Sequence, residues 1–364
     1  FLFYSPEYVP IASTSELDRW RKQYLLFCRV ATGYNGGNAH LNVLRALGRV
    51  ATVPRYAFWN CTALTLTHLP HGITTIEEGA FRNCTALTLT QLPEGVTTIQ
   101  EGAFNGCRAL ALTQLPEGLS TIAPETFSGC ASLALTQLPH GITRIDTGAF
   151  KSCDNLALTQ LSDGLTAIGE GAFHACRSLA LAQLPNGVTT MGNFAFNGCR
   201  ALALTQLPHG ITRIQSGTFW GCHALALTHL PHGLTTIGDN AFWDCRTLAL
   251  TQLPEGVTRI GPYAFCNCFA LALTQLPNGV TKMEERVFAE CPLLTITQLP
   301  HGILKIGEGA FESCTLLALT QLPNGITKIG AQAFKQCRNL ALTQLPTGLS
   351  TIGPFTFSGC HALA

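Results

Sequence analysis

The stretch LALTQLPHGIT, at Leu133–Thr143, returns letter for letter at Leu202–Thr212, and close variants of it fill residues 61–364. The cysteines give the period. Fourteen of them, from Cys61 to Cys360, stand 23 residues apart with no insertion or deletion. A register kept over so many units indicates a repeat architecture, in which the quoted stretch is a building unit and not a reactive site.

One unit, called a rung below, reads C-x-x-L-A-L-T-Q-L-P-x-G-[IVL]-T-x-I-G-x-x-A-F-x-x when the cysteine is position 0. Burying one large apolar side chain is worth about 1.5–3 kcal/mol, against an ordering entropy of about 1.5 kcal/mol per residue. A single rung cannot enclose its own apolar side chains, whereas stacked rungs bury them against one another. The sequence therefore predicts a β-dominated α/β repeat fold, a solenoid of stacked 23-residue rungs.

The rung that starts at Cys130 shows the expected local structure. Leu133, Leu135 and Leu138 predict a short strand that pairs in parallel with its equivalents, at a spacing of about 4.8 Å. Pro and Gly then end the strand, and [IVL]-T-x-I forms a second, shorter extended piece. The segment G-x-x-A-F-x-x-C has apolar residues at helical spacing. We therefore expect a parallel β-sheet on one side of the solenoid and short helical turns on the other.

The segment LPEGVTTIQEGAFNGC, at Leu92–Cys107, carries almost every element of a known pattern. The unit resembles the BspA-like, or Treponema pallidum-type, leucine-rich repeat, over residues 61–364 and weakly from about Asn38. One departure is the Thr at position 6, where the family has an aliphatic residue and this chain has Leu one position earlier. The inward or outward phase of the strand is therefore open by one residue. The resemblance implies a leucine-rich-repeat solenoid with a binding role, and membership of a group whose proteins are often surface proteins in adhesion.

The chain divides into three parts. Residues 1–37 are expected to form an N-terminal helical segment or cap, or the tail of a preceding domain. Residues 38–60 align as a degenerate capping repeat, since terminal rungs are commonly atypical. Residues 61–364 form the array of leucine-rich repeats, and the absence of an initial Met and the stop inside a repeat predict a fragment truncated at the C-terminus.

Composition excludes several classes of function. Charged residues make up 12% and hydrophobic residues 46%, and the net charge is +1, so no global attraction to nucleic acid or anionic membrane is expected. No apolar run is long enough for a membrane span in this fragment. No catalytic constellation departs from the repeat, which predicts a non-enzymatic protein without cofactor or metal. The compartment is left unassigned, with a cell-surface or secreted location implied only by the resemblance.

The ladder cysteines are expected to be free and buried, because a thiol is a good small core residue. Neighbouring rungs could in principle bring two of them within disulfide distance. Zinc is disfavoured because the chain has no C-x-x-C pair, and Cys266-x-Cys268 has the wrong spacing.

Position 14 supplies the main candidate site. It is Thr in many rungs and basic in four successive ones, at Arg259, Lys282, Lys305 and Lys328, with Arg144 and Arg213 at the same position earlier in the chain. Stacked like charges cost stability, so a stripe of this kind could bind an acidic partner or a polyanionic glycan. The alternative is a solvated stripe whose charge is relieved by Glu285 and Glu308.

Histidines supply a second candidate. His209, His229 and His232 would lie close together on stacked rungs, where they could bind a metal or sense pH. The alternative is that they are variable surface residues beside the end of the strand.

These observations favour a binding scaffold for protein–protein interaction or adhesion through one face of the solenoid. A protein partner is expected, with an acidic or glycan ligand as the possibility that the basic stripe raises, and nucleic acid is not expected. Two alternatives stay open: a spacer or stalk for a domain missing from this fragment, and a repeat array beside a missing catalytic domain.

Overall fold

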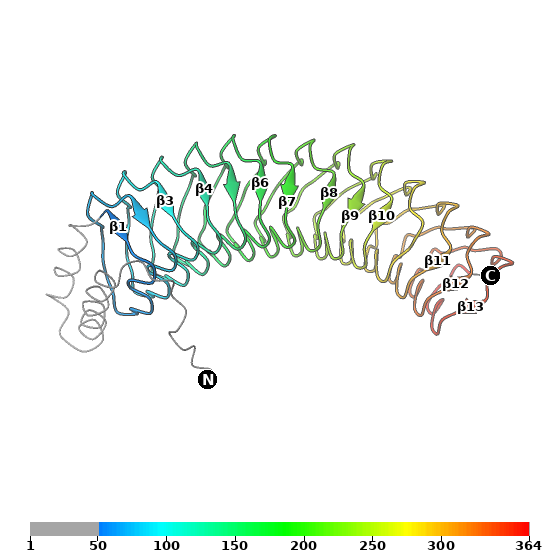
Figure 1. The fold of residues 1–364 in the computed structure, drawn as a ribbon. Helices are drawn as coiled ribbons and strands as arrows, with labels where there is room; N and C mark the ends of the chain where they lie inside the picture. The colour runs from blue at the N-terminus through cyan, green and yellow to red at the C-terminus, as the bar shows by residue number, and fades with distance from the viewer. Residues whose placement is uncertain (1–50, 364) are drawn as a thin grey trace.

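The computed structural model of the protein describes residues 51–363, which form a curved stack of rungs (Figure 1). The predicted N-terminal helical segment and most of the degenerate repeat lie outside these residues. Each strand is two residues long. The strands are β1 (Thr52–Val53), β2 (Thr75–Ile76), β3 (Thr98–Ile99), β4 (Thr121–Ile122), β5 (Arg144–Ile145), β6 (Ala167–Ile168), β7 (Thr190–Met191), β8 (Arg213–Ile214), β9 (Thr236–Ile237), β10 (Arg259–Ile260), β11 (Lys305–Ile306), β12 (Lys328–Ile329) and β13 (Thr351–Ile352).

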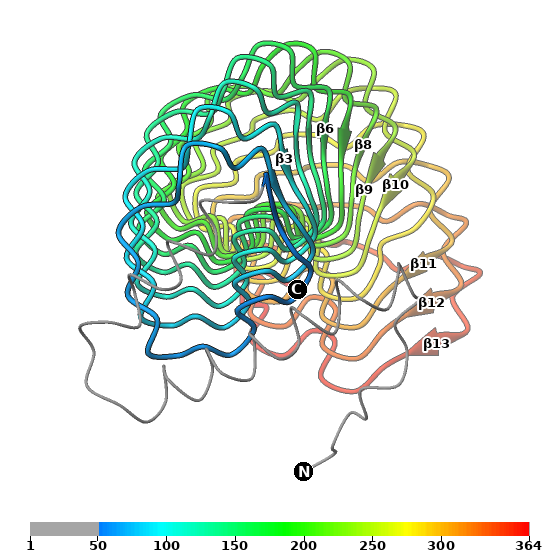
Figure 2. The ribbon, with the colours of Figure 1, turned by 60° about the vertical axis from the view of Figure 1, so that its left-hand side comes forward.

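All strand pairs are parallel and one rung apart, so that Arg144 lies beside Ala167 and Ile145 beside Ile168. The strands group into four short sheets, β1–β3, β4–β7, β8–β10 and β11–β13. They line one flank of the arc (Figure 2). This flank is called the strand face below.

The predicted position of the strand is wrong. The paired residues are those of the [IVL]-T-x-I segment, which we expected to be the lesser extended piece. The leucine segment makes only isolated backbone bonds between rungs, such as that from Ala157 N–H to Leu135 O at 3.2 Å, and so does not form a ladder. Its phase is nevertheless clear, because Leu133 and Leu135 are buried while Thr136 is exposed.

The predicted helical turn is also wrong, because residues 51–363 contain no helix. In the rung of Cys130, Gly148 and Ser152 have φ of +60° and +58°. Left-handed residues four positions apart interrupt a right-handed helix. The amides of Gly148, Phe150 and Ser152 instead donate to carbonyls of the next rung at 2.7–2.8 Å. The segment is therefore a stack of tight turns joined along the solenoid axis.

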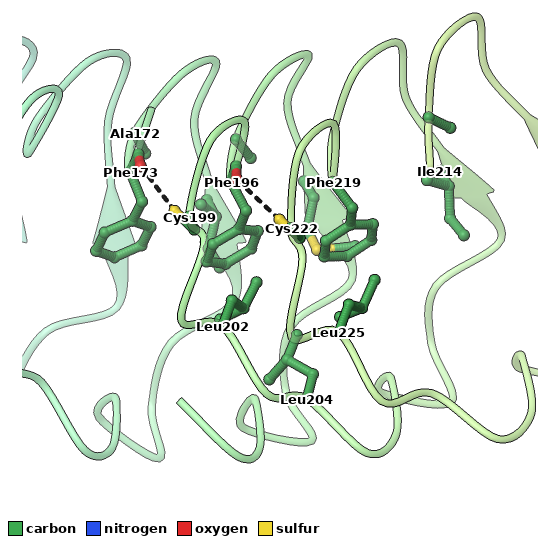
Figure 3. Close-up of a cluster of buried hydrophobic side chains, with 14 of the residues drawn as sticks. Ala172, Phe173, Phe196, Cys199, Leu202, Leu204, Ile214, Phe219, Cys222 and Leu225 are labelled. Carbon is green, nitrogen blue, oxygen red and sulfur yellow. Dashed lines mark hydrogen bonds between the residues drawn. The ribbon is translucent and has the colours of Figure 1, made fainter. Parts of the chain in front are cut away.

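The core is a set of columns that run through all the described rungs. One column is a stack of phenylalanine rings from Phe58 to Phe357, with neighbouring centroids 5.1–5.8 Å apart and ring planes within 18° of parallel. Figure 3 shows three of these rings, Phe173, Phe196 and Phe219, with leucines and cysteines of the core beside them. Twelve of the phenylalanines, from Phe81 to Phe334, are fully buried, and offset stacking of this kind adds to the stabilisation that burial supplies.

The cysteines form a second column. From Cys84 to Cys360, each ladder thiol donates to the backbone carbonyl of the Phe 26 residues earlier, at 2.9–3.1 Å. Figure 3 shows two such bonds, from Cys199 to Phe173 and from Cys222 to Phe196. From Cys107 onward these are free thiols, as predicted.

Glycine at position 16 lets neighbouring rungs approach closely on the strand face. A Cβ added to Gly238 would lie 2.6 Å from the backbone N of Ser216, so a side chain would force the rungs apart. Gln215 and Glu284 carry side chains at this position after a rung with Gly, and the sheet breaks there, between β7 and β8 and between β10 and β11. The break before β4 has no such explanation.

Candidate binding surface on the strand face

The basic stripe predicted at position 14 lies on the strand face. Arg259, Lys305 and Lys328 are the first residues of β10, β11 and β12, and all three are exposed. Lys305 and Lys328 are direct partners in the parallel register. Lys282 is exposed one rung before Lys305, where the isolated bridge from Met283 to Ile306 aligns the two rungs. The fold thus brings the four predicted side chains into one row.

The charges in this row are not equivalent. Arg259 forms an ion pair with Asp239, with 2.9 Å between Nη2 and Oδ1. Arg144, the first basic residue at this position, is paired with Asp146. By contrast, none of the ion pairs found in residues 51–363 involves the three lysines. The three consecutive lysines are therefore like charges without a carboxylate partner in that part of the chain.

The two glutamates expected to relieve the stripe do not pair with it. Glu285 accepts a hydrogen bond from the hydroxyl of Tyr263. Glu308 is exposed and lies in the neighbourhood of the lysines without an ion pair to them. The electrostatic repulsion between stacked lysines is therefore relieved mainly by solvent and ions.

A groove of about 760 Å³ runs along the lysines over β11–β13, and this surface is called the lysine groove below. Its volume is within the usual range of ligand pockets, about 300–1,000 Å³. Three residues of its lining are glycines at position 16, which contribute no side chain: Gly307, Gly330 and Gly353. Its lining includes the side chains of Lys282, Lys305, Lys328, Glu284, Glu308 and Leu304.

A second groove, of about 570 Å³, lies over β5–β7 and the turn after β8. The lining of this groove also includes two glycines at position 16, Gly169 and Gly192. Here Arg144 is neutralised by Asp146, and the following rungs carry Ala and Thr at position 14. The repeated backbone therefore forms two grooves that differ in the charge of one row of side chains and in the presence of Leu304.

The three predicted histidines lie apart from both grooves. His209 and His232 are exposed at position 10 of consecutive rungs, and His229 is exposed at position 7 of the same rung as His232. His229 Nδ1 lies 3.1 Å from the hydroxyl of Thr228. In the described part of the chain, no group of three or more His, Cys, Asp or Glu is arranged to hold a metal ion.

An aromatic cluster on the turns was not predicted from the sequence. Trp220 and Trp243 stack with centroids 4.8 Å apart, and Trp243 stacks on Tyr263 at 5.4 Å. The ring of Phe194 lies over the backbone of Gly217, where an added Cβ would come within 2.3 Å of it. Within residues 51–363, every Trp and Tyr lies at position 18 or 21 of a rung. These positions read as variable in the repeat pattern, and a count of aromatic residues by position would have identified them.

Polar side chains beside this cluster are fixed by one carboxylate. Asp244 bonds His223 Nε2 at 2.8 Å and Arg246 Nε at 2.9 Å. Partial burial of the Asp244 carboxyl opposes its ionisation, but the hydrogen bonds from Arg246 and His223 outweigh that effect and lower its pKa. The network keeps a charged edge next to the aromatic rings.

The buried thiols are poorly suited to chemistry. Desolvation raises the pKa of Cys107 and of Cys176 to about 12. It also raises the pKa of Cys266, outside the ladder, to about 11. A nucleophilic cysteine needs the opposite shift, toward the thiolate at neutral pH. The ladder cysteines therefore serve packing and not catalysis.

A solenoid of leucine-rich rungs, with a parallel strand in each and an open strand face, defines the class of leucine-rich-repeat proteins. The pattern of the family described as "BspA type Leucine rich repeat region (6 copies)" matches residues 51–161, 144–271 and 236–364. The chain belongs to this family, as its resemblance in sequence indicated. Among residues 51–363 there is no helix with the length and hydrophobicity of a membrane span.

Several solved structures are similar. A leucine-rich repeat protein from Bacteroides ovatus has 28% identity and a TM-score of 0.62, over 82% of this chain and 85% of that one. A leucine-rich cell surface protein from Faecalibacterium prausnitzii has 27% identity and a TM-score of 0.46, over 84% and 77%. The leucine-rich repeat protein of T. pallidum has 34% identity and a TM-score of 0.38, over 44% and 76%. No curated protein matches the chain.

Proposed function

We propose that the protein is a non-enzymatic binding scaffold that holds an anionic protein partner against its strand face. The contact surface is the stripe of Arg259, Lys282, Lys305 and Lys328. The observation that carries the proposal is that Lys282, Lys305 and Lys328 stand in consecutive rungs, exposed and outside every ion pair found for residues 51–363.

The fold does not require these lysines. The same position is Thr in seven of the described rungs and Ala in another, and those rungs stack in the same way. Like charges stacked on neighbouring strands are destabilising. In the same stripe, the charge of Arg259 is matched within the chain by its ion pair with Asp239. A negatively charged ligand would give the lysines an ion-pair partner, as Asp239 does for Arg259.

A repeat array suits this role because it presents a long regular surface on a rigid core. Adhesion at a cell surface is the biological setting that we propose, on the resemblance to BspA-like proteins alone. If the array is instead a spacer, or a companion of a catalytic domain, its strand face would have no ligand of its own.

The test is a selection of random displayed peptides on the purified chain and on two matched variants. One variant carries Lys305→Glu and Lys328→Glu, and the other carries Arg144→Glu and Arg213→Glu, the same change at the same position of other rungs. We expect acidic peptides to be enriched on the unmodified chain and on the arginine variant, and lost on the lysine variant. Failure to enrich any peptide on the unmodified chain, or equal loss on both variants, would overturn the proposal.

A further inference from the structure

The geometry points to a more specific ligand for the lysine groove. We propose that the groove binds an acidic peptide segment that also carries apolar side chains. The carboxylates of the peptide meet Lys282, Lys305 and Lys328, and an apolar side chain packs on Leu304. This inference rests on the proposed function and names the chemistry of its partner.

Leu304 is the first reason. It occupies position 13, which is Thr or Ser in every other rung from Thr74 to Ser350. In seven of these rungs the hydroxyl donates to the backbone carbonyl of the preceding rung, as Thr235 does to Thr212 at 3.1 Å and Ser350 to Thr327 at 2.9 Å. Leu304 cannot donate this bond, and 56% of its surface is exposed.

The replacement is unfavourable for the array taken alone. It gives up a hydroxyl that bonds between rungs in seven other places, and it leaves an apolar side chain in water where a hydroxyl stands elsewhere. An exposed leucine on its own is ordinary. This one lies on the strand face in the same groove as the unpaired lysines. Two independent departures from the repeat therefore coincide at one place.

The groove has a shape that fits a chain segment. At Gly330 an added Cβ would lie 2.5 Å from the backbone N of Glu308, and at Gly353 it would lie 2.3 Å from that of Ala331. These glycines let the rungs approach closely and leave the floor without side chains. The lining continues from Leu304 to Pro354, across successive rungs, so the groove accommodates an extended ligand better than a compact one.

The apolar part of the lining favours a peptide over a sulfated glycan. A glycan of that kind supplies negative charge but no aliphatic side chain to cover Leu304. Burying one leucine against it is worth about 1.5–3 kcal/mol. A peptide with both carboxylates and leucines matches both departures, and so it is the ligand that we propose.

The second groove on the strand face, at Arg144, provides an internal contrast. It has the same glycine floor, but its basic residue is paired with Asp146 and its position 13 keeps Thr166 and Thr189. It lacks both departures, so we expect it not to bind the same peptide.

The experiment measures the affinity of the chain for three probes: a short peptide of alternating glutamate and leucine, the same peptide with serine for leucine, and a heparin oligosaccharide. Variants are Leu304→Thr and the triple change Lys282→Thr, Lys305→Thr and Lys328→Thr, each of which installs the residue found in other rungs. Leu316→Thr is the matched control, because Leu316 is 40% exposed outside the groove. Thermal unfolding checks that each variant folds.

We expect the glutamate–leucine peptide to bind about tenfold or more tightly than the glutamate–serine peptide, a difference of about 1.4 kcal/mol. Leu304→Thr removes that advantage, Leu316→Thr preserves it, and the triple lysine change weakens both peptides. Equal binding of the two peptides, or no effect of Leu304→Thr, overturns this inference and leaves the proposed anionic contact intact. Tighter binding of heparin, insensitive to Leu304→Thr, overturns it in favour of a glycan. If displayed peptides are also not enriched, the proposed function fails as well.

Discussion

The column of ladder thiols and the row formed by Lys282, Lys305 and Lys328 are both stacks of identical side chains, one per rung. The thiols are neutral and buried, and each donates to a Phe carbonyl of an earlier rung, as Cys222 does to Phe196 at 3.1 Å. The lysines are charged and exposed, and none joins an ion pair found within residues 51–363. Repetition therefore stabilises the thiol column, whereas in the lysine row it adds electrostatic repulsion.

The difference shows what repetition alone can explain. A side chain that bonds along the solenoid axis is stabilising in every rung, so the fold accounts for its presence. A charged side chain that only repels its neighbours is not explained by the fold. Two kinds of change test this difference: ionisation of the buried thiols and removal of the exposed lysines.

Alkaline pH should have the largest effect, because it charges the thiols. Burial raises the pKa of Cys107 and Cys176 to about 12, and that of other ladder thiols above its ordinary value. A raised folded pKa contributes stability that is fully present below the unfolded value, near 9, and is lost as pH rises toward the folded value. Each such thiol then removes up to about 1.4 kcal/mol of unfolding free energy per pH unit. Circular dichroism against pH should show cooperative unfolding above pH of about 9.

The control for this titration is the variant with Lys305→Thr and Lys328→Thr. The two lysines that it removes are exposed and lie outside the core. The variant should unfold at the same pH as the unmodified chain. A transition that moved with the lysines would show that the surface, and not the thiol column, sets alkaline stability.

Removing one thiol should have the next largest effect. Cys222→Ala deletes the bond to Phe196 O and leaves a small cavity beside the ring stack, at a fully buried position. The expected loss is about 1–2 kcal/mol in urea unfolding. The comparable truncation in the other stack, Lys305→Ala, should change stability little, and an equal loss at both sites would contradict the distinction between the stacks.

Leu304→Thr should stabilise the array. The new hydroxyl can donate to the carbonyl of Thr281, as the equivalent hydroxyls do in other rungs, and one apolar side chain leaves the surface. We expect a gain of about 0.5–1.5 kcal/mol, measured as a rise in Tm. A fall in Tm would mean that Leu304 serves the packing of the fold, which would remove its value as evidence for a ligand.

Lys305→Thr should have the smallest effect. Removing the central lysine relieves repulsion from both neighbours, which is worth about 0.2–0.5 kcal/mol at low salt and fades as salt screens the charges. Arg259→Thr should give no such gain, because it breaks the pair with Asp239. Urea unfolding of both variants at low and high salt checks the difference, and a gain that persists at high salt would exclude electrostatic relief as its cause.

The period predicted the stack, the buried columns and the free thiols, because those features follow from which side chains repeat. It did not predict the turns. Ala149, Phe150 and Cys153 have the same spacing in a helix and in the observed turns, and the distinguishing residues are Gly148 and Ser152, with positive φ. The excess of Gly, Asn and Ser at these two positions was the sequence signal for left-handed backbone. The strand was misplaced because both leucine and isoleucine segments are apolar, and only the latter pairs as a ladder.

The position of the basic stripe could be predicted, since residues at one position of a repeat must align. The sequence does not reveal which of these charges are neutralised by a carboxylate. The partner of Arg259 is Asp239, twenty residues away in a neighbouring rung, and their contact depends on how far apart the rungs are. The groove could not be predicted either. It arises where glycines such as Gly330 lie close to the backbone of the preceding rung, and that distance depends on how the rungs stack.

The thiol column has a further use as a built-in reporter of local opening. Each rung from Cys107 to Cys337 carries a buried thiol that a reagent reaches only when that rung opens. Mass spectrometry of alkylated peptides would therefore give an opening free energy for each rung in one experiment, as hydrogen exchange does for amides. Such a profile would reveal whether the array opens as one cooperative unit or in blocks, and whether the sheet breaks at Gln215 and Glu284 are the boundaries of those blocks.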